Sequence, residues 1–219
     1  MHKQDQELTD KVQSLINSDQ DLAGYLVQGR SRGGIIHLQG IVDVLAEKYR
    51  AEELLKQIPG VVGVENGITV STDGDINDQS VEFEVNEEIN ADPRVQLKEV
   101  EVQSDSGVVH LRGEVRTLAE AKAAEVAASR SRGVKEVVSE LRVVSDVDDA
   151  SLTNRVEMAL GESGKVNPYL INSASRRGVV TLHGTVTDGF MRELAEEITA
   201  GVPGVRRIEN HLRLEPEKQ

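Results

Sequence analysis

The sequence predicts an α+β fold of three tandem αββαβ units, each a three-stranded mixed sheet with two helices packed on one face. The main observation is a repeat: GGIIHLQGIV at 33–42 returns as SGVVHLRGEV at 106–115 and as RGVVTLHGTV at 177–186. The second is that helical and strand periodicities flank all three copies in the same order. We therefore expect units at residues 5–72, 78–145 and 149–216.

The first predicted element of each unit is a short amphipathic helix. Apolar residues recur every four positions, which marks one face of a helix. The three sets are Leu8, Val12 and Ile16, then Val81, Val85 and Ile89, then Leu152, Val156 and Leu160.

Two strands joined by a tight turn are predicted next. The first strand holds Tyr25 and Val27, with Lys98 and Val100 or Tyr169 and Ile171 as counterparts. The second is the repeated stretch, whose alternation places Ile36, Leu38, Gly40 and Val42 on one face. We expect the helices to cover that face, with Gly40 admitting a helix backbone closely. His37, His110 and His183 then project from the open face.

A second helix and a third strand complete each unit. The helices are drawn from 43–58, 117–130 and 188–202, and Thr117 with Glu120 forms a capping box. The first two strands pair antiparallel across the turn, whereas the helical crossover makes the third strand parallel. Polar stretches at 71–79 and 145–150 read as linkers between units.

Composition excludes several classes of function. The 219 residues contain no cysteine, so disulfide scaffolds, cysteine-bound metals and thiol nucleophiles are ruled out. The net charge of −13 opposes non-specific binding to nucleic acid and to anionic bilayers, which leaves only local basic patches, within a Debye length of about 8 Å, for such contacts. No apolar run reaches the roughly 20 residues of a spanning helix, and the first residues lack a signal-peptide core. A cytoplasmic location is expected for the sequence as given, or the periplasm or envelope if the chain is truncated.

The strand, helix and final-strand pattern resembles the BON domain, named for bacterial osmotically inducible and nodulation-related proteins. Ser139 stands where the other two copies have Asn66 and Asn210. The resemblance implies a binding module and no reaction: such domains are associated with envelope phospholipids, and one cytosolic member binds potassium. The glycines that carry the resemblance, and that we expect to define the fold, are Gly34, Gly40, Gly60, Gly107, Gly113, Gly133, Gly178, Gly184 and Gly204.

The candidate ligand-binding residues are arginines predicted at two hairpin turns. Arg30 and Arg32 are predicted to occupy the hairpin turn of the first unit, and Arg176 and Arg177 that of the third, whereas the middle unit places Asp105 there. Guanidinium groups suit phosphates and lipid head groups. Counted with the adjoining linkers and termini, as residues 1–75, 76–147 and 148–219, the units carry −5, −6 and −2, so the third is least repelled by an anionic surface.

Other motifs favour structural interpretations. Residues 161–166, GESGKV, lack the spacing of a phosphate loop and read as a helix end. The histidines lack a local partner motif, so no catalytic or metal site is predicted. Glu82, Glu84, Glu87 and Glu88 read as a solvated helix face, and the Asp73 and Asp75 segment breaks the pattern of a calcium loop.

The sequence therefore predicts a non-enzymatic triple binding protein without a cofactor, acting in stress or envelope maintenance. The expected partner is an anionic phospholipid surface or an envelope protein, and no nucleic acid. The alternative is a soluble cytoplasmic stress protein that binds potassium. A potassium site built from backbone carbonyls would leave almost no signature in the sequence.

Overall fold

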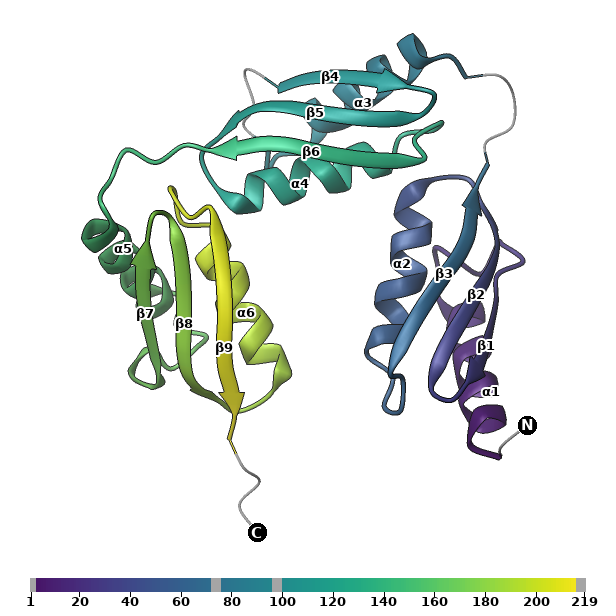
Figure 1. Ribbon diagram of the computed structural model, residues 1–219, viewed down its shortest axis with the longest axis horizontal. Coiled ribbons are helices and arrows are strands. Elements are labelled where there is room, and N and C mark those ends of the chain that lie inside the picture. Colours follow the sequence, from purple (N-terminus) through teal and green to yellow (C-terminus); the bar gives the residue numbers. More distant parts are fainter. Residues whose placement is uncertain (1–2, 72–75, 96–99, 216–219) are drawn as a thin grey trace. The chain divides into compact units, whose positions relative to one another are not determined.

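The computed structural model describes residues 3–71, 76–95 and 100–215, which form three αββαβ repeats in chain order (Figure 1). The first repeat contains α1 (Lys3–Ser18), β1 (Gln28–Arg32), β2 (Ile35–Val42), α2 (Leu45–Lys56) and β3 (Gly63–Val70). The middle repeat contains α3 (Asp78–Ala91), β4 (Val100–Asp105), β5 (Val108–Val115), α4 (Leu118–Ser129) and β6 (Glu136–Val143). The third contains α5 (Asp149–Glu162), the one-turn 3₁₀ helix η1 (Pro168–Leu170), β7 (Ile171–Arg176), β8 (Val179–Val186), α6 (Gly189–Ala200) and β9 (Arg207–Leu214).

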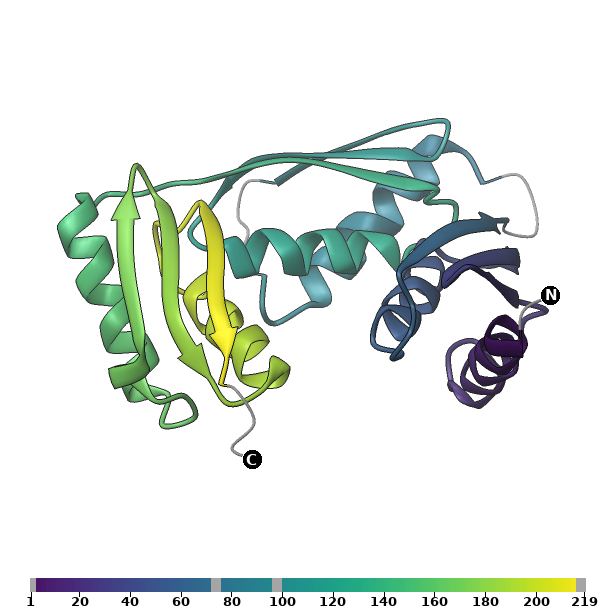
Figure 2. The same cartoon turned by 60° about the horizontal axis from the view of Figure 1, so that its bottom comes forward.

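Each repeat has its own three-stranded sheet, with the strands in sequence order. In the first and third repeats the central strand pairs antiparallel with the strand before it and parallel with the strand after it. A hairpin turn makes the antiparallel pair, and the helix between the second and third strands makes the parallel one. In Figure 2 the strands of the first repeat lie above both of its helices. The predicted mixed αββαβ architecture is confirmed.

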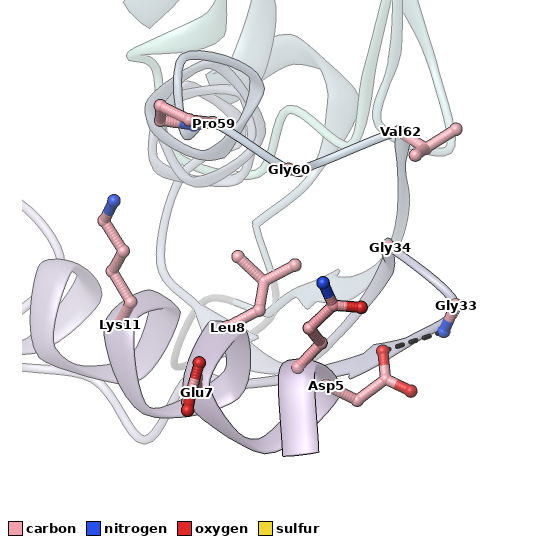
Figure 3. Close-up of a pocket in the computed structure, with 10 residues that line it drawn as sticks. Asp5, Glu7, Leu8, Lys11, Gly33, Gly34, Pro59, Gly60 and Val62 are labelled. Atoms are coloured by element: carbon pink, nitrogen blue, oxygen red, sulfur yellow. Dashed lines mark hydrogen bonds between the residues drawn. The ribbon is translucent and has the colours of Figure 1, made fainter. Parts of the chain in front are cut away.

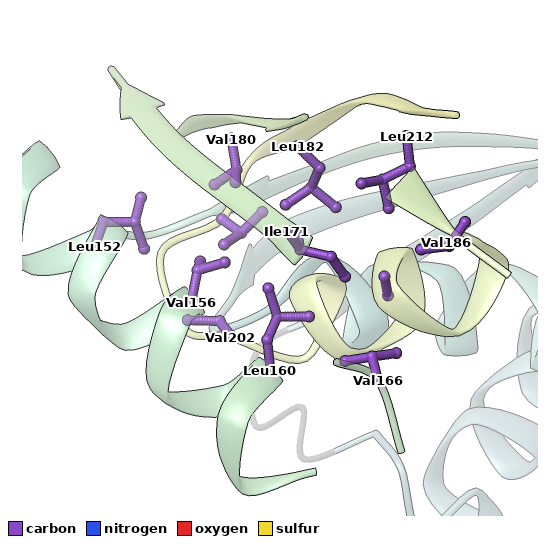
Figure 4. Packing of buried hydrophobic residues seen from close by; sticks show 12 residues of the cluster. Leu152, Val156, Leu160, Val166, Ile171, Val180, Leu182, Val186, Val202 and Leu212 are labelled. Carbon is purple, nitrogen blue, oxygen red and sulfur yellow. The ribbon is translucent and has the colours of Figure 1, made fainter. Parts of the chain in front are cut away.

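The core of the third repeat shows how sequence periodicity becomes packing (Figure 4). Leu152, Val156 and Leu160 on one face of α5 are buried against Val180 and Leu182 from β8. The corresponding core of the first repeat is built from Val12 and Ile16 with the inner residues of β2. Side chains repeating at four on the helix and at two on the strand thus meet in one apolar layer.

The segment before the first strand departs from the prediction. Tyr25 and Val27 precede β1 instead of lying in it, and Tyr169 lies in η1. The Tyr25 hydroxyl donates to Asp43 and Glu47 at 3.0 and 2.8 Å, which ties this segment to the beginning of α2. Side-chain hydrogen bonds therefore hold this segment, in place of the backbone hydrogen bonds that a longer β1 would have made. Lys98, and Asp73 and Asp75 of the first predicted linker, fall outside the described residues.

Candidate functional site

Each sheet has one face covered by its helices and one face without helices, which we call the outer face. In β2, Ile36, Leu38 and Val42 are buried, whereas His37 and Gln39 alternate with them and point outward. In β1, Gly29 and Ser31 are buried and Arg30 is exposed. The alternation predicted for the repeated strand is confirmed, and it leaves the polar side chains on the outer face.

The arginines predicted in the hairpin turns lie mostly on strands. Arg30 and Arg32 belong to β1, and Gly33 and Gly34 form the turn with φ values of 62° and 81°. This corrects the predicted placement. Glycine adopts left-handed φ at little cost, so it takes the turn positions and leaves the arginines in the ladder.

The third repeat differs by one residue at the same turn. Arg176 ends β7, while Arg177 lies in the turn with a φ of 53°. Arg177 is thus the one predicted arginine that occupies a turn. Asp105 ends β4, on the strand as Arg32 is.

The outer face of the first repeat is basic. Arg30 lies opposite His37 across the hairpin, and His37 lies opposite Glu65 on β3. The His37 Nδ1 is 2.8 Å from the Glu65 Oε2. Glu65 is the one acidic side chain that β1, β2 and β3 carry on this face, and it is paired with His37. Arg30 and Arg32 remain exposed. An open hollow on this side is lined by Asp5, Gln28, Arg30, Ser31, Arg32, His37 and Gln39.

The outer face of the third repeat is also basic. His183 and His211 face each other on adjacent parallel strands, with stacked rings whose centroids are 5.2 Å apart. Arg213 lies two residues beyond His211 and lines the same shallow hollow. Three arginines lie on this face against one glutamate; they are Arg176, Arg207 and Arg213 against Glu209, which pairs with Arg207.

The middle repeat has the opposite character. Arg112 donates to Glu140 at 2.8 Å and Arg142 to Glu114 at 3.2 Å, so both outer arginines are neutralised across the sheet. The remaining outer charges are acidic: Glu101, Asp105 and Glu136. In a chain with a net charge of −13, the outer sheet faces of the first and third repeats are therefore basic, whereas that of the middle repeat is acidic.

A polar clamp at the beginning of each first helix was not predicted. In the first repeat, Asp5 accepts hydrogen bonds from the Ser31 hydroxyl and from the Gly33 amide, both at 2.9 Å, and Figure 3 shows the bond from Gly33. Thr9, one helical turn later, accepts from the Ser31 amide at 2.9 Å. Figure 3 shows Asp5 at the edge of an open hollow between α1 and the loop at Gly60, with its carboxylate turned to the hairpin.

The clamp recurs in the other repeats at equivalent positions. Asp78 accepts from the Ser104 hydroxyl at 2.6 Å and from the Ser106 and Gly107 amides at 3.0 and 3.1 Å. These bonds, led by that from Ser104, lower the pKa of Asp78 below its usual value. In the third repeat Asp149 accepts from the Gly178 amide at 3.4 Å. The sequence signal for this clamp is an aspartate at the same place in each repeat, at positions 5, 78 and 149.

The glycine of the central strand has a different neighbour from the one predicted. A Cβ built on Gly40 would lie 2.9 Å from the Leu26 carbonyl oxygen, and one on Gly184 would clash with that of Leu170. The segment before the first strand, and not a helix backbone, therefore crosses closely here. Positive φ values occur at all the predicted fold-defining glycines: Gly34, Gly40, Gly60, Gly107, Gly113, Gly133, Gly178, Gly184 and Gly204.

The asparagine of the last strand ties that strand to the second helix. Asn66 Nδ2 donates to the Lys48 carbonyl at 2.8 Å, and its Oδ1 accepts from the Ile68 amide at 3.2 Å. Asn210 makes the same two kinds of bond, to the Arg192 carbonyl and from the Leu212 amide. The asparagine in the family pattern therefore has a structural role.

Other candidate chemistry is limited in the described part of the chain. Across residues 3–71, 76–95 and 100–215, no group of three or more histidine or acidic side chains is placed to hold a metal ion. Within the same ranges, no helix combines the length and apolar character needed to cross a membrane. Gly161 lies in the last turn of α5 and Gly164 follows that helix, as predicted for the GESGKV segment.

Comparison with known proteins identifies one family and one curated relative. The model of the family described as the BON domain matches residues 4–72, 77–145 and 148–216. Osmotically-inducible protein Y of Escherichia coli (strain K12) is 26% identical over 144 residues, which cover 63% of this chain and 72% of that protein.

Solved structures match at low similarity. CdsD, a structural protein of the type III secretion system of Chlamydia trachomatis, is 16% identical with a TM-score of 0.29, covering 97% of this chain and 94% of that chain. A periplasmic domain of PrgH, a type III secretion inner membrane protein of S. typhimurium, is 13% identical with a TM-score of 0.24. It covers 94% of this chain and 100% of that chain.

Proposed function

Because the chain belongs to the BON domain family, with three copies along its length, we propose that it is a non-enzymatic binding protein that attaches to anionic phospholipid surfaces. The observation that carries this proposal is the basic outer face of the first and third repeats. Besides Arg207, which pairs with Glu209, the exposed arginines of these faces are Arg30, Arg32, Arg176 and Arg213.

The outer face of one repeat should bind an anionic membrane weakly, and the outer faces of the first and third repeats should bind more tightly when both contact the same membrane. Each basic residue near an anionic membrane contributes about 1 kcal/mol. A face with two or three arginines therefore binds weakly alone, while two faces on one chain gain affinity through effective concentration. The guanidinium fork also matches phosphate oxygens in geometry. The acidic middle repeat contributes no attraction.

The biological setting follows from the relative. The name of the E. coli protein states that it is osmotically inducible, which supports a role for this chain in osmotic stress or envelope maintenance. The binding role itself rests on the charge of the two faces.

Vesicle sedimentation tests the proposal. The chain should sediment with vesicles of phosphatidylglycerol and phosphatidylcholine more than with phosphatidylcholine alone, and less at high salt because salt screens the charges. The double variant Arg30→Glu with Arg176→Glu should reduce sedimentation about tenfold or more. A matched control, Lys11→Glu with Arg192→Glu, makes the same change in net charge on exposed positions of α1 and α6.

Two results would contradict the proposal: equal sedimentation with neutral and anionic vesicles, or equal losses in the two double variants. The latter would mean that net charge alone governs binding. A thermal shift produced by potassium and not by sodium, without vesicle binding, would favour the alternative cation-binding role.

A further inference from the structure

Exposed apolar side chains gather at one end of the third repeat, where β8 ends and β7 begins. Tyr169 is 93% exposed, Phe190 is 66% exposed and Leu214 is 51% exposed. With the exposed Leu170 they form what we call the apolar tip. The chain has only three tyrosines and two phenylalanines, so two of these five side chains lie at this one end.

The sheet register places these residues at the same end. The Leu170 carbonyl crosses Gly184 near the end of β8. Leu214 lies opposite Val186, the last residue of β8, and the Glu215 amide donates to the Val186 carbonyl at 2.8 Å. Asp188 caps α6 by accepting a hydrogen bond from the Met191 amide at 2.8 Å. Phe190 lies in the first turn of α6, four residues after the end of β8.

The exposed aromatic pair of the tip is specific to the third repeat, whereas the counterpart of Leu170 is Leu26, which is 91% exposed. The positions equivalent to Phe190 are Ala46 and Ala119 in the first and middle repeats. The tyrosine equivalent to Tyr169 is Tyr25, whose hydroxyl is held by Asp43 and Glu47. The same fold is thus built without an exposed aromatic pair, and folding does not require one here.

The shape and surroundings of the tip favour a bilayer over a protein groove. Tyr169 projects from a one-turn helix with almost its whole side chain in solvent, which suits insertion into a fluid medium. Tyrosine is enriched at membrane interfaces, and phenylalanine and leucine form the buried apolar side of interfacial segments. Arg213 lies on the basic outer face and immediately precedes Leu214 in β9, so head-group phosphates bound by Arg213 would lie near the tip.

We infer that the apolar tip of the third repeat inserts into the interfacial layer of an anionic phospholipid bilayer beside the attached outer face; this inference rests on the proposed function. Asp188 and Glu215 lie at the same end as Arg213, so acidic and basic groups both lie near the tip. The affinity of the tip therefore comes from its apolar side chains, and it should persist at salt concentrations that weaken the arginine contacts.

Single tryptophan reporters test the insertion, since the chain contains no tryptophan. Tyr169→Trp and Phe190→Trp place reporters in the tip, and Phe83→Trp on α3 is a matched control because Phe83 is 69% exposed. With phosphatidylglycerol–phosphatidylcholine vesicles, emission of both tip reporters should shift to the blue and be quenched by lipids brominated on their acyl chains. The reporter at position 83 should do neither.

A second pair of variants measures the contribution to affinity. Tyr169→Ser with Phe190→Ser should weaken vesicle binding about tenfold or more, because each ring buries a large apolar area. Phe83→Ser should leave it unchanged. These positions are exposed, so circular dichroism should show intact folding in every variant.

The outcomes separate the two proposals. Vesicle binding without a blue shift at positions 169 and 190 would overturn the insertion and leave the proposed function standing. Absence of vesicle binding would overturn both. A blue shift that depends on protein concentration and appears without vesicles would show self-association through the tip, and would overturn the insertion as well.

Discussion

Single polar residues hold the hairpin of each repeat against its first helix. Asp5, Asp78 and Asp149 occupy equivalent places and accept hydrogen bonds from the hairpin. Such bonds satisfy backbone amides that the turn leaves without a ladder partner. The clamp therefore stabilises the geometry from which the outer-face arginines project.

The clamp at Asp78 should make the stability of the middle repeat depend on pH. Because hydrogen bonding lowers the folded-state pKa, the stabilisation is present above the unfolded-state pKa of about 3.9 and is lost as the pH falls through the folded value. Asp78→Asn should lower the midpoint of thermal unfolding at pH 7 and speed hydrogen exchange at the Ser106 and Gly107 amides. It should also flatten the acid dependence of the midpoint.

The control for this prediction is Glu87→Gln, which removes one negative charge from an exposed position on α3. Identical acid dependence in Asp78→Asn and in the unmodified chain would contradict the role assigned to the clamp.

At the scale of elements, paired glycines allow the hairpin and the loop before the last strand to touch. A Cβ on Gly107 would lie 2.6 Å from the Gly133 carbonyl oxygen, and the Gly107 carbonyl accepts from the Lys135 amide at 2.8 Å. The first repeat makes the same bond, from the Val62 amide to Gly34, also at 2.8 Å. The glycines of the repeated pattern thus mark close contacts between backbones.

The crossing at the central strand gives a sharp test. Gly184→Ala places a methyl group against the Leu170 carbonyl at a φ of 136°, so it should destabilise the third repeat by at least about 3 kcal/mol. Gly161→Ala is the matched control: nothing lies within 4 Å of its Cβ in α5, and it should stabilise by about 0.5–1 kcal/mol. Urea unfolding measures both, and equal effects would contradict the backbone crossing.

At the scale of the whole molecule, the apolar cores of the first and third repeats are each assembled from that repeat's own residues. The cluster of the third repeat uses only side chains between Val147 and Leu212, and that of the first only those between Leu8 and Val70. A unit of this size buries roughly 60% of the surface that its unfolded chain exposes, so each core is small but self-contained.

We therefore predict that residues 148–216 fold alone. The fragment should show mixed helix and strand circular dichroism and a cooperative thermal transition. A fragment of 111–178, which joins halves of two repeats and is of similar length, should remain unfolded. A fragment of 148–216 without a cooperative transition would show that this repeat needs the rest of the chain.

Much of this architecture could be predicted because the relevant interactions are local and repeat three times. The helix face Leu152, Val156 and Leu160 follows from a period near four, and the strand face Val180 and Leu182 from a period of two. Prediction failed for Arg30 and Arg32, because the turn position depends on which glycines adopt positive φ.

The sequence by itself determined the number of repeats, the order of elements, the mixed sheets and which strand face is buried, since periodicity and turn residues encode these in neighbouring positions. Tertiary structure decided the rest: the clamp from Asp5 to a hairpin far along the chain, the crossing of Leu170 over Gly184, and the grouping of Tyr169, Phe190 and Leu214 at one end. These depend on contacts between residues distant in sequence, which local patterns do not specify.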